Sequence, residues 1–156
     1  MALTSNKSNG SKSQEATALL HADHKLVSSL FEEYESTKSS SKKKALVSQI
    51  CKELTVHAQV EEEIFYPAVQ AALKDHELIP EATVEHATLK ALIAEVEGVE
   101  PSGDMYDAKI KVLSEYVTHH VKEEESEMFP QAKSTKLDMM DLGSQMAERK
   151  TQLMAE

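Results

Sequence analysis

The sequence contains no Trp, one Cys, and only four residues each of Gly and Pro. The single thiol, Cys51, excludes an internal disulfide and fits a reducing compartment. The scarcity of helix breakers, together with seven Met and many Ala, Leu, Val and Ile, favours helices over strands. The length of 156 residues is enough for one domain with a substantial core and is short for two.

Long apolar segments and excess positive charge are also missing. No run of about 18 apolar residues could span a bilayer, and no apolar segment follows the N-terminus as in a secretory signal. The net charge of −10 makes nucleic acid and anionic membranes poor partners. The sequence therefore predicts a cytoplasmic protein that binds neither nucleic acid nor a membrane.

What the chain does contain is four segments whose apolar residues alternate in steps of three and four, as on one face of a helix. A polar, Ser-rich, non-periodic stretch precedes them, so residues 1–14 are predicted to be a disordered tail. The four stripes are Leu20, His24, Val27, Phe31 and Tyr34; Ile50, Leu54, His57, Glu61 and Ile64; Ala82, His86, Leu89, Ile93 and Val96; and Tyr106, Ile110, Leu113, Val117, His120 and Glu124.

Helix ends are expected at prolines and polar residues. Pro67 is expected to perturb or stop the second helix, Pro80 to take the first position of the third, and Asp104 to cap the fourth. Short polar loops between the helices predict an all-α, up-down-up-down antiparallel four-helix bundle over residues 15–133. An amphipathic stretch within residues 134–156 is predicted to form an extra C-terminal helix packed on the bundle.

The two halves of the predicted bundle resemble each other. In each half a His is followed four residues later by Glu and ten residues later by Pro, and an acidic residue next to another His lies upstream. Two such hairpins would form a bundle with approximate two-fold symmetry, so a site on its axis would be built from paired ligands. The first half holds Asp23, His24, His57, Glu61 and Pro67, and the second holds Glu85, His86, His120, Glu124 and Pro130.

Six of these residues occupy inward-facing positions where a bundle core normally has Leu, Ile, Val or Ala. Burying unpaired carboxylates costs several kcal/mol, and a bound cation is the usual resolution. Residues i and i+4 lie about 6 Å apart on one helix face, so each His-x3-Glu pair can serve one metal or two neighbouring metals. The candidate ligands are His24, His57, Glu61, His86, His120 and Glu124.

The mixed donor set indicates the kind of metal. Four imidazoles with two carboxylates suit a borderline transition metal such as iron, whereas Mg²⁺ or Ca²⁺ would call for oxygen ligands alone. Six protein ligands are too many for one catalytic zinc with an open position. Shared between two irons, with the carboxylates bridging, they leave positions for a small exogenous ligand.

In this order and spacing, the motifs resemble those of the haemerythrin-like, HHE cation-binding family over roughly residues 15 to 132. The resemblance implies an oxo- or hydroxo-bridged centre of two Fe ions and chemistry with O2, H2O2 or NO. Oxygen-carrying haemerythrins are similar but have a fifth His, at the position that Ala82 occupies here. Either the site keeps an extra open coordination position, or another residue fills it, with His21 the first candidate and Tyr116 and Glu53 the next.

The missing fifth His argues against simple oxygen carriage, and a sensor would be expected to carry an output domain. The leading hypothesis is therefore H2O2 breakdown or redox protection. Reversible O2 or NO binding without turnover, and a non-catalytic helical module stapled by metal, are the alternatives. Ferritin-like chemistry is disfavoured, because none of the seven His has a Glu three residues before it.

The remaining polar residues near the stripes are assigned outer roles. His119 is expected to flank His120 without binding metal, and His76 to face solvent in a loop. Glu62 and Glu125 are expected on solvated faces or as hydrogen-bond partners of the ligands. All four Tyr are expected at the edge of the core: Tyr34, Tyr66, Tyr106 and Tyr116.

Overall fold

The computed structural model describes residues 14–156, and the tail predicted at residues 1–14 lies outside them except for its last residue. The described residues form helices and no strands, which confirms the all-α prediction. None of these helices is both long enough and apolar enough to traverse a lipid bilayer. The elements are α2 (Ala16–Ser36), α3 (Ser40–Val60), η1 (Glu61–Phe65), α4 (Tyr66–Leu73), α5 (Leu78–Val96), α6 (Gly103–Glu123), η2 (Glu124–Met128), α7 (Phe129–Lys133) and α8 (Met139–Met154).

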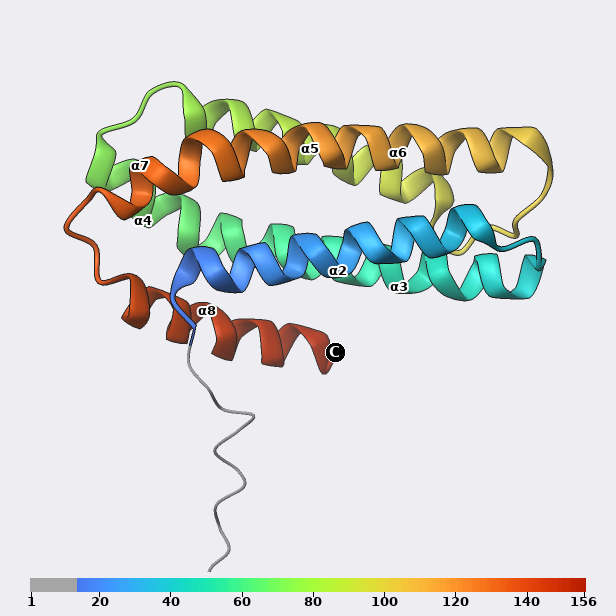
Figure 1. Cartoon of the computed structure of the whole chain (residues 1–156), viewed down its shortest axis with the longest axis horizontal. Helices are drawn as coiled ribbons and strands as arrows, with labels where there is room; N and C mark the ends of the chain where they lie inside the picture. The colour runs from blue at the N-terminus through green and yellow to red at the C-terminus, as the bar shows by residue number, and fades with distance from the viewer. Residues whose placement is uncertain (1–13) are drawn as a thin grey trace, which may run out of the picture.

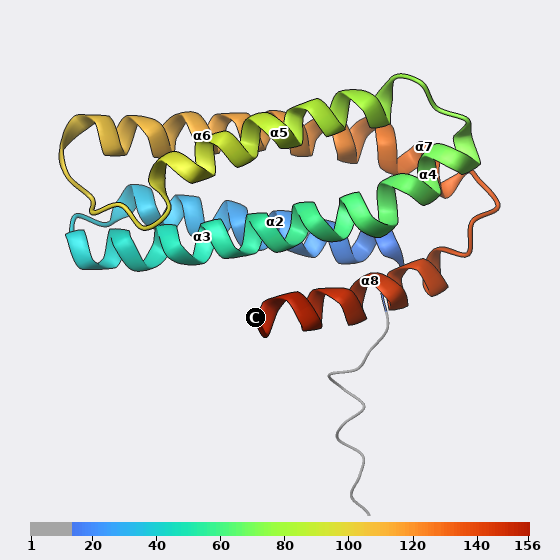
Figure 2. The ribbon, with the colours of Figure 1, turned by 180° about the vertical axis from the view of Figure 1, so that it is seen from behind.

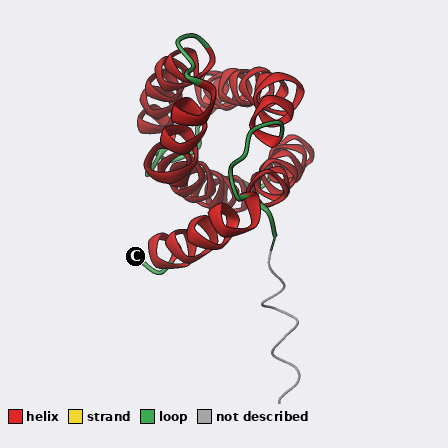
Figure 3. Cartoon of the chain, turned by 90° about the vertical axis from the view of Figure 1, so that its left-hand side faces the viewer, coloured by secondary structure: helices red, strands yellow, loops and turns green. Residues whose placement is uncertain are grey.

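Four long helices, α2, α3, α5 and α6, lie side by side and alternate in direction (Figures 1 and 2). Viewed along the bundle they form a ring of four, and α8 lies outside it (Figure 3). α8 packs against α2, α3 and η1. The predicted up-down-up-down bundle with an extra C-terminal helix is therefore the observed fold.

Local side-chain caps explain where several helices begin. The Glu15 carboxylate accepts the free N–H groups of Thr17 and Ala18 at the start of α2. Asp75 does the same for the first residues of α5, so that helix begins at Leu78, two residues earlier than the predicted start at Pro80. The predicted cap at Asp104 is also displaced, because α6 begins at Gly103 and Ser102 takes the cap position.

The two prolines of the repeated motif do not stop their helices. α3 runs through the π-helical turn η1 directly into α4, and α6 runs through η2 into α7. Pro67 and Pro130 lie in the first turn of α4 and α7, just after the wider π turns. A π turn gives the proline ring, which has no N–H, room against the preceding turn. The prolines therefore perturb the helices and do not end them.

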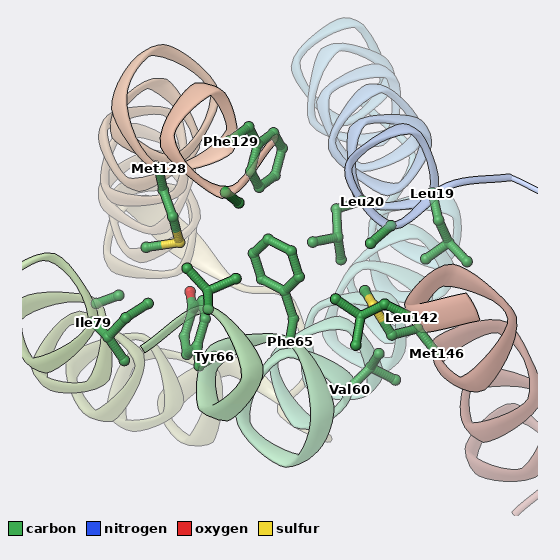
Figure 4. Packing of buried hydrophobic residues seen from close by; sticks show 14 of the residues in the cluster. Leu19, Leu20, Val60, Phe65, Tyr66, Ile79, Met128, Phe129, Leu142 and Met146 are labelled. Atoms are coloured by element: carbon green, nitrogen blue, oxygen red, sulfur yellow. The ribbon is translucent and has the colours of Figure 1, made fainter. Parts of the chain in front are cut away.

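The buried apolar side chains form two clusters, one toward each end of the bundle. The first cluster includes Leu20, Phe65, Tyr66, Phe129 and Met146 and joins α8 to the bundle (Figure 4). The second cluster lies between the four long helices and includes Val27, Ile50, Leu54, Leu89 and Leu113. Along each long helix the buried His falls between residues of the two clusters, so the polar residues form a layer between two apolar ones.

Candidate metal centre

The six predicted ligands come together in this polar layer. One His comes from each long helix, and the two carboxylates come from the π turns. Glu61 is 0% exposed and Glu124 is 1% exposed, so both carboxylates are removed from water. The four imidazoles are buried as well: His24, His57, His86 and His120.

The ligand atoms form two groups of four that share both carboxylates. The first group is His24, His57, Glu61 and Glu124, and the second is Glu61, His86, His120 and Glu124. Within each group the nearest ligand atoms all lie within 4.8 Å of one another. Each group could hold a metal ion, and both carboxylates are common to the two groups.

Each carboxylate faces one imidazole from either group. The two Oε atoms of Glu61 lie 3.2 Å from His57 Nε2 and 3.1 Å from His86 Nε2. Those of Glu124 lie 3.1 Å from His24 Nε2 and 3.3 Å from His120 Nε2. All four Nε2 atoms therefore point toward the shared carboxylates, in approximate two-fold symmetry.

Each imidazole is held from behind by a further carboxylate at Nδ1. Glu62 and Glu125, expected near the ligands, bind His86 at 2.7 Å and His24 at 2.6 Å. The other two acceptors are Asp23, 2.9 Å from His57 Nδ1, and Glu85, 2.5 Å from His120 Nδ1. A carboxylate that accepts from Nδ1 fixes the tautomer in which Nε2 carries the lone pair, as metal-ligating histidines require.

The site also contains a residue that the sequence did not reveal, Tyr66. Its hydroxyl donates to Glu124 and to Glu61, the latter at 3.0 Å, and lies 3.1 Å from His86 Nε2 and 3.3 Å from His120 Nε2. The expectation that Tyr66 lies at the core edge is therefore wrong.

The three residues proposed to replace the missing fifth His lie elsewhere. His21 is 54% exposed and pairs with Glu125 at 2.8 Å. Tyr116 packs against the second cluster, and Glu53 is partly exposed on α3. Ala82, at the position of the missing His, is a buried member of the first cluster.

The π turn explains why Tyr66 reaches the site. In a regular α-helix, residue i+5 lies about 140° around the axis from residue i. In η1 the Tyr66 N–H instead bonds to the Glu61 carbonyl, which winds the chain less and brings the Tyr66 side chain back over Glu61. Phe129 takes the equivalent place after η2, and its ring stacks on His24 at 5.8 Å. The hydroxyl therefore lies beside the imidazoles of one ligand group, His86 and His120, and Phe129 lies beside His24 of the other.

The electrostatics of the polar layer favour the protonated form of His57 and His120 and the ionised form of Glu124. Burial alone would lower the pKa of His57, but the charges of Glu61 and Asp23 and the hydrogen bond to Asp23 raise it well above its usual value. Burial is likewise outweighed at His120, where Glu124 above all raises the pKa to about 9. The pKa of Glu124 lies well below its usual value, because hydrogen bonds from His120 and His24 outweigh burial.

Two unpaired buried atoms indicate that the layer fits a cation. His57 Nε2 and Glu61 Oε2 are buried and 3.2 Å apart, yet neither has a hydrogen-bond partner. Buried polar atoms without partners are rare and costly in native proteins. A metal ion between an imidazole nitrogen and a carboxylate oxygen would satisfy both, so the residues present fit the metal that the motif implies.

The other histidines lie where the sequence places them. His119 is 61% exposed and lies 3.2 Å from Glu123 on its own helix. His76 is exposed in the loop between α4 and α5. Neither belongs to the two groups that share Glu61 and Glu124.

A small apolar cavity adjoins the four imidazoles on the side of the second cluster. Its volume is about 20 Å³, and it is closed by aliphatic side chains such as Val27, Leu89 and Val117. A surface groove of about 520 Å³ between α2 and α6 shares His24, Val117 and Val121 with this cavity. Space for one water-sized molecule therefore lies beside the imidazoles.

The comparisons with known proteins agree with this fold and site. The family model for the Hemerythrin HHE cation binding domain matches residues 15–132, so the chain belongs to this cation-binding family. Its structure resembles the crystal structure of a Hemerythrin HHE cation binding domain-containing protein from Mycobacterium kansasii. The TM-score is 0.78 at 26% identity, over 91% of this chain and 88% of the other.

One curated relative is named for a different activity. The chain is 31% identical over 111 residues to a protein named DNA nickase from Nostoc sp. (strain PCC 7120 / SAG 25.82 / UTEX 2576). The match covers 71% of this chain but only 31% of that relative. The chain thus spans less than a third of the relative's length.

Proposed function

We propose that this protein is a non-haem di-iron protein that breaks down hydrogen peroxide. The observation that carries the proposal is the pair of ligand groups that share two buried carboxylates. Glu61 and Glu124 would each serve both groups, so the six residues would hold two metal ions side by side, as two-metal chemistry requires. Two irons bound there would supply the redox equivalents that pass two electrons from one peroxide molecule to the next.

The reaction needs protons as well as electrons. In 2 H2O2 → O2 + 2 H2O, one molecule gives up two electrons and two protons, and the other accepts them as its O–O bond breaks. Tyr66 is suited to hold a proton at its hydroxyl, because burial and then the charges of Glu61 and Glu124 raise its pKa well above the usual value. Its contacts with both carboxylates give that proton two acceptors inside the site.

The size of the cavity supports a small ligand. A volume of about 20 Å³ has room for about one water-sized molecule, which favours a ligand of two to four atoms over an organic substrate. The four outer carboxylates keep the imidazoles oriented while such a ligand enters, because each Nδ1 is already bonded. The Glu61 and Glu124 carboxylates are fixed in turn by the imidazoles they face.

The test is oxygen evolution from H2O2 by the iron-loaded protein, followed with an oxygen electrode. The proposal predicts one O2 for every two H2O2 consumed, and no O2 from protein loaded with zinc, which occupies the same ligands but is redox-inert. Iron-loaded protein that leaves H2O2 intact would contradict the proposal. It would favour reversible O2 or NO binding, which the same cavity admits. Zinc bound in preference to iron would favour a non-catalytic module in which the metal only stabilises the helical bundle.

The name of the Nostoc relative does not lead us to propose action on DNA. Binding to nucleic acid rests mainly on neutralising phosphates with Lys and Arg. This chain has 27 Asp and Glu against 17 Lys and Arg, a net charge of −10. The match covers only 31% of that relative's length, so its named activity is not carried over to this chain.

A further inference from the structure

Lys150, on the C-terminal helix α8, contacts an outer carboxylate of the candidate metal centre. Lys150 Nζ lies 2.5 Å from Asp23 Oδ1, and the other oxygen of Asp23 accepts from His57 Nδ1 at 2.9 Å. A chain of contacts therefore runs from α8 through Asp23 and His57 to Glu61. The family match ends at residue 132, so Lys150 is supplied by a part of the chain outside it.

We infer that Lys150 is a positioning residue for the metal centre, acting through Asp23 and His57 on one of the two metal positions. This inference rests on the proposed metal site. Asp23 is only 6% exposed, so its carboxylate needs partners to remain in place and charged. Without Lys150 the carboxylate would be free to turn toward solvent, and this change removes the acceptor that orients His57.

The effect is confined to one ligand group because, among residues 14–156, Asp23 is the one outer carboxylate that Lys150 contacts. In the other group a different cation, Lys90, lies 2.8 Å from Glu62, the acceptor of His86 Nδ1. His120, the counterpart of His57, is held by Glu85, and Glu85 has no Lys or Arg partner among residues 14–156. His57 belongs to the group with His24, and His120 to the group with His86. Loss of Lys150 therefore weakens the first metal position and leaves the second unchanged.

The same helix provides a matched control in Arg149. Its guanidinium bonds to both oxygens of Glu63, at 2.7 and 3.2 Å, so it also ties α8 to η1 with an ion pair. Arg149 and Lys150 are similarly exposed, at 31% and 30%. Among residues 14–156, the side chain of Glu63 bonds to Gln59 and Arg149 and to no site histidine. Replacing Arg149 thus removes a comparable tether without touching the metal centre.

The test measures release of Co²⁺ from the full chain into excess EDTA, followed by the visible absorption of the bound ion. We expect Lys150→Met to release half of the Co²⁺ about tenfold faster than the unmodified protein, the lower end of effects seen for outer-shell partners. The other half should leave at the normal rate. Arg149→Met should release all of its Co²⁺ at the normal rate, and Lys150→Arg should restore slow release.

The outcomes separate the two hypotheses. Equal release from Lys150→Met and Arg149→Met would overturn the role of Lys150 while leaving the metal centre intact. Failure of the unmodified protein to bind Co²⁺ would instead overturn the metal centre itself. Should Lys150→Met fail to fold by circular dichroism, Lys150→Gln serves in its place, with the same expected release.

Discussion

At the scale of single residues, Tyr66 and Phe129 make the two halves of the site unequal. They occupy equivalent positions after the two π turns, but only Tyr66 offers a hydroxyl to the shared carboxylates. Phe fits this position in the other half, where it contacts His24. Removing the hydroxyl should therefore change the chemistry without disturbing the packing.

Tyr66→Phe should keep its full metal content but lose about 100-fold in the rate of oxygen evolution from H2O2, within the range for removal of a positioned proton donor. Elemental analysis and an oxygen electrode on the same sample measure both quantities. Tyr116→Phe is the control and should match the unmodified protein, since Tyr116 packs in the second cluster. Wild-type turnover in Tyr66→Phe would show that its proton is not used.

The sequence predicted the residues that follow helical periodicity. His24, His57, His86 and His120 interrupt apolar stripes in step, so their convergence could be foreseen from spacing alone. Tyr66 could not, because its place depends on a π turn, and no spacing rule for α-helices brings residue i+5 over residue i. Lys150 could not either, since it comes from a helix whose docking site the sequence does not specify.

At the scale of elements, α8 crosses the start of α2 at a glycine. A Cβ on Gly143 would lie 2.1 Å from the Gln14 carbonyl oxygen and 2.9 Å from the Ala16 nitrogen. Such approaches are too close for any side chain, so the helices can pack this closely only because residue 143 is Gly.

Gly143→Ala should therefore lower the free energy of unfolding by about 1–3 kcal/mol, the usual cost of overpacking. At an exposed helical site the same change would stabilise by about 1 kcal/mol, so the sign itself is diagnostic. Thermal or urea unfolding of the full chain measures it. Ser144→Ala, on the exposed side of α8, is the control and should change stability little. A more stable Gly143→Ala variant would mean that α8 does not pack here.

The surface groove between the helices α2 and α6 is the path by which we expect a small ligand to reach the cavity. Val117 and Val121, one turn apart on α6, line both spaces. Val121→Phe should slow azide binding to the diferric protein by roughly tenfold, equivalent to a barrier about 1.4 kcal/mol higher, with the absorption spectrum unchanged. Stopped-flow absorption measures the rate, and the exposed Val112→Phe is the control. Unchanged azide kinetics in Val121→Phe would place the route elsewhere.

At the scale of the whole molecule, the charge of the buried histidines depends on whether metal is bound. Without metal, the pKa of His120 is about 9, above its usual value near 6.5. A raised His pKa stabilises the folded protein fully below about pH 6.5, and this contribution is lost as pH rises through about 9. Metal needs the neutral imidazole, so binding near pH 7 must displace a proton from His120.

Metal-free protein should accordingly lose stability between about pH 6.5 and 9, whereas the metal-loaded protein should not show this dependence. Calorimetric titration with Zn²⁺ at pH 7, in buffers of different ionisation enthalpy, should show proton release on binding. Zn²⁺ binding without release of protons would contradict the assignment of His120 as a charged group in the metal-free state.

The most direct test of the central claim is the iron content of the full chain after anaerobic loading with Fe²⁺ and removal of unbound metal. Two ligand groups that share Glu61 and Glu124 predict two irons per chain. Replacing Glu61 with Ala should remove both ions, because each group loses a shared ligand. One iron per chain in the unmodified protein, or none, would contradict the di-iron centre.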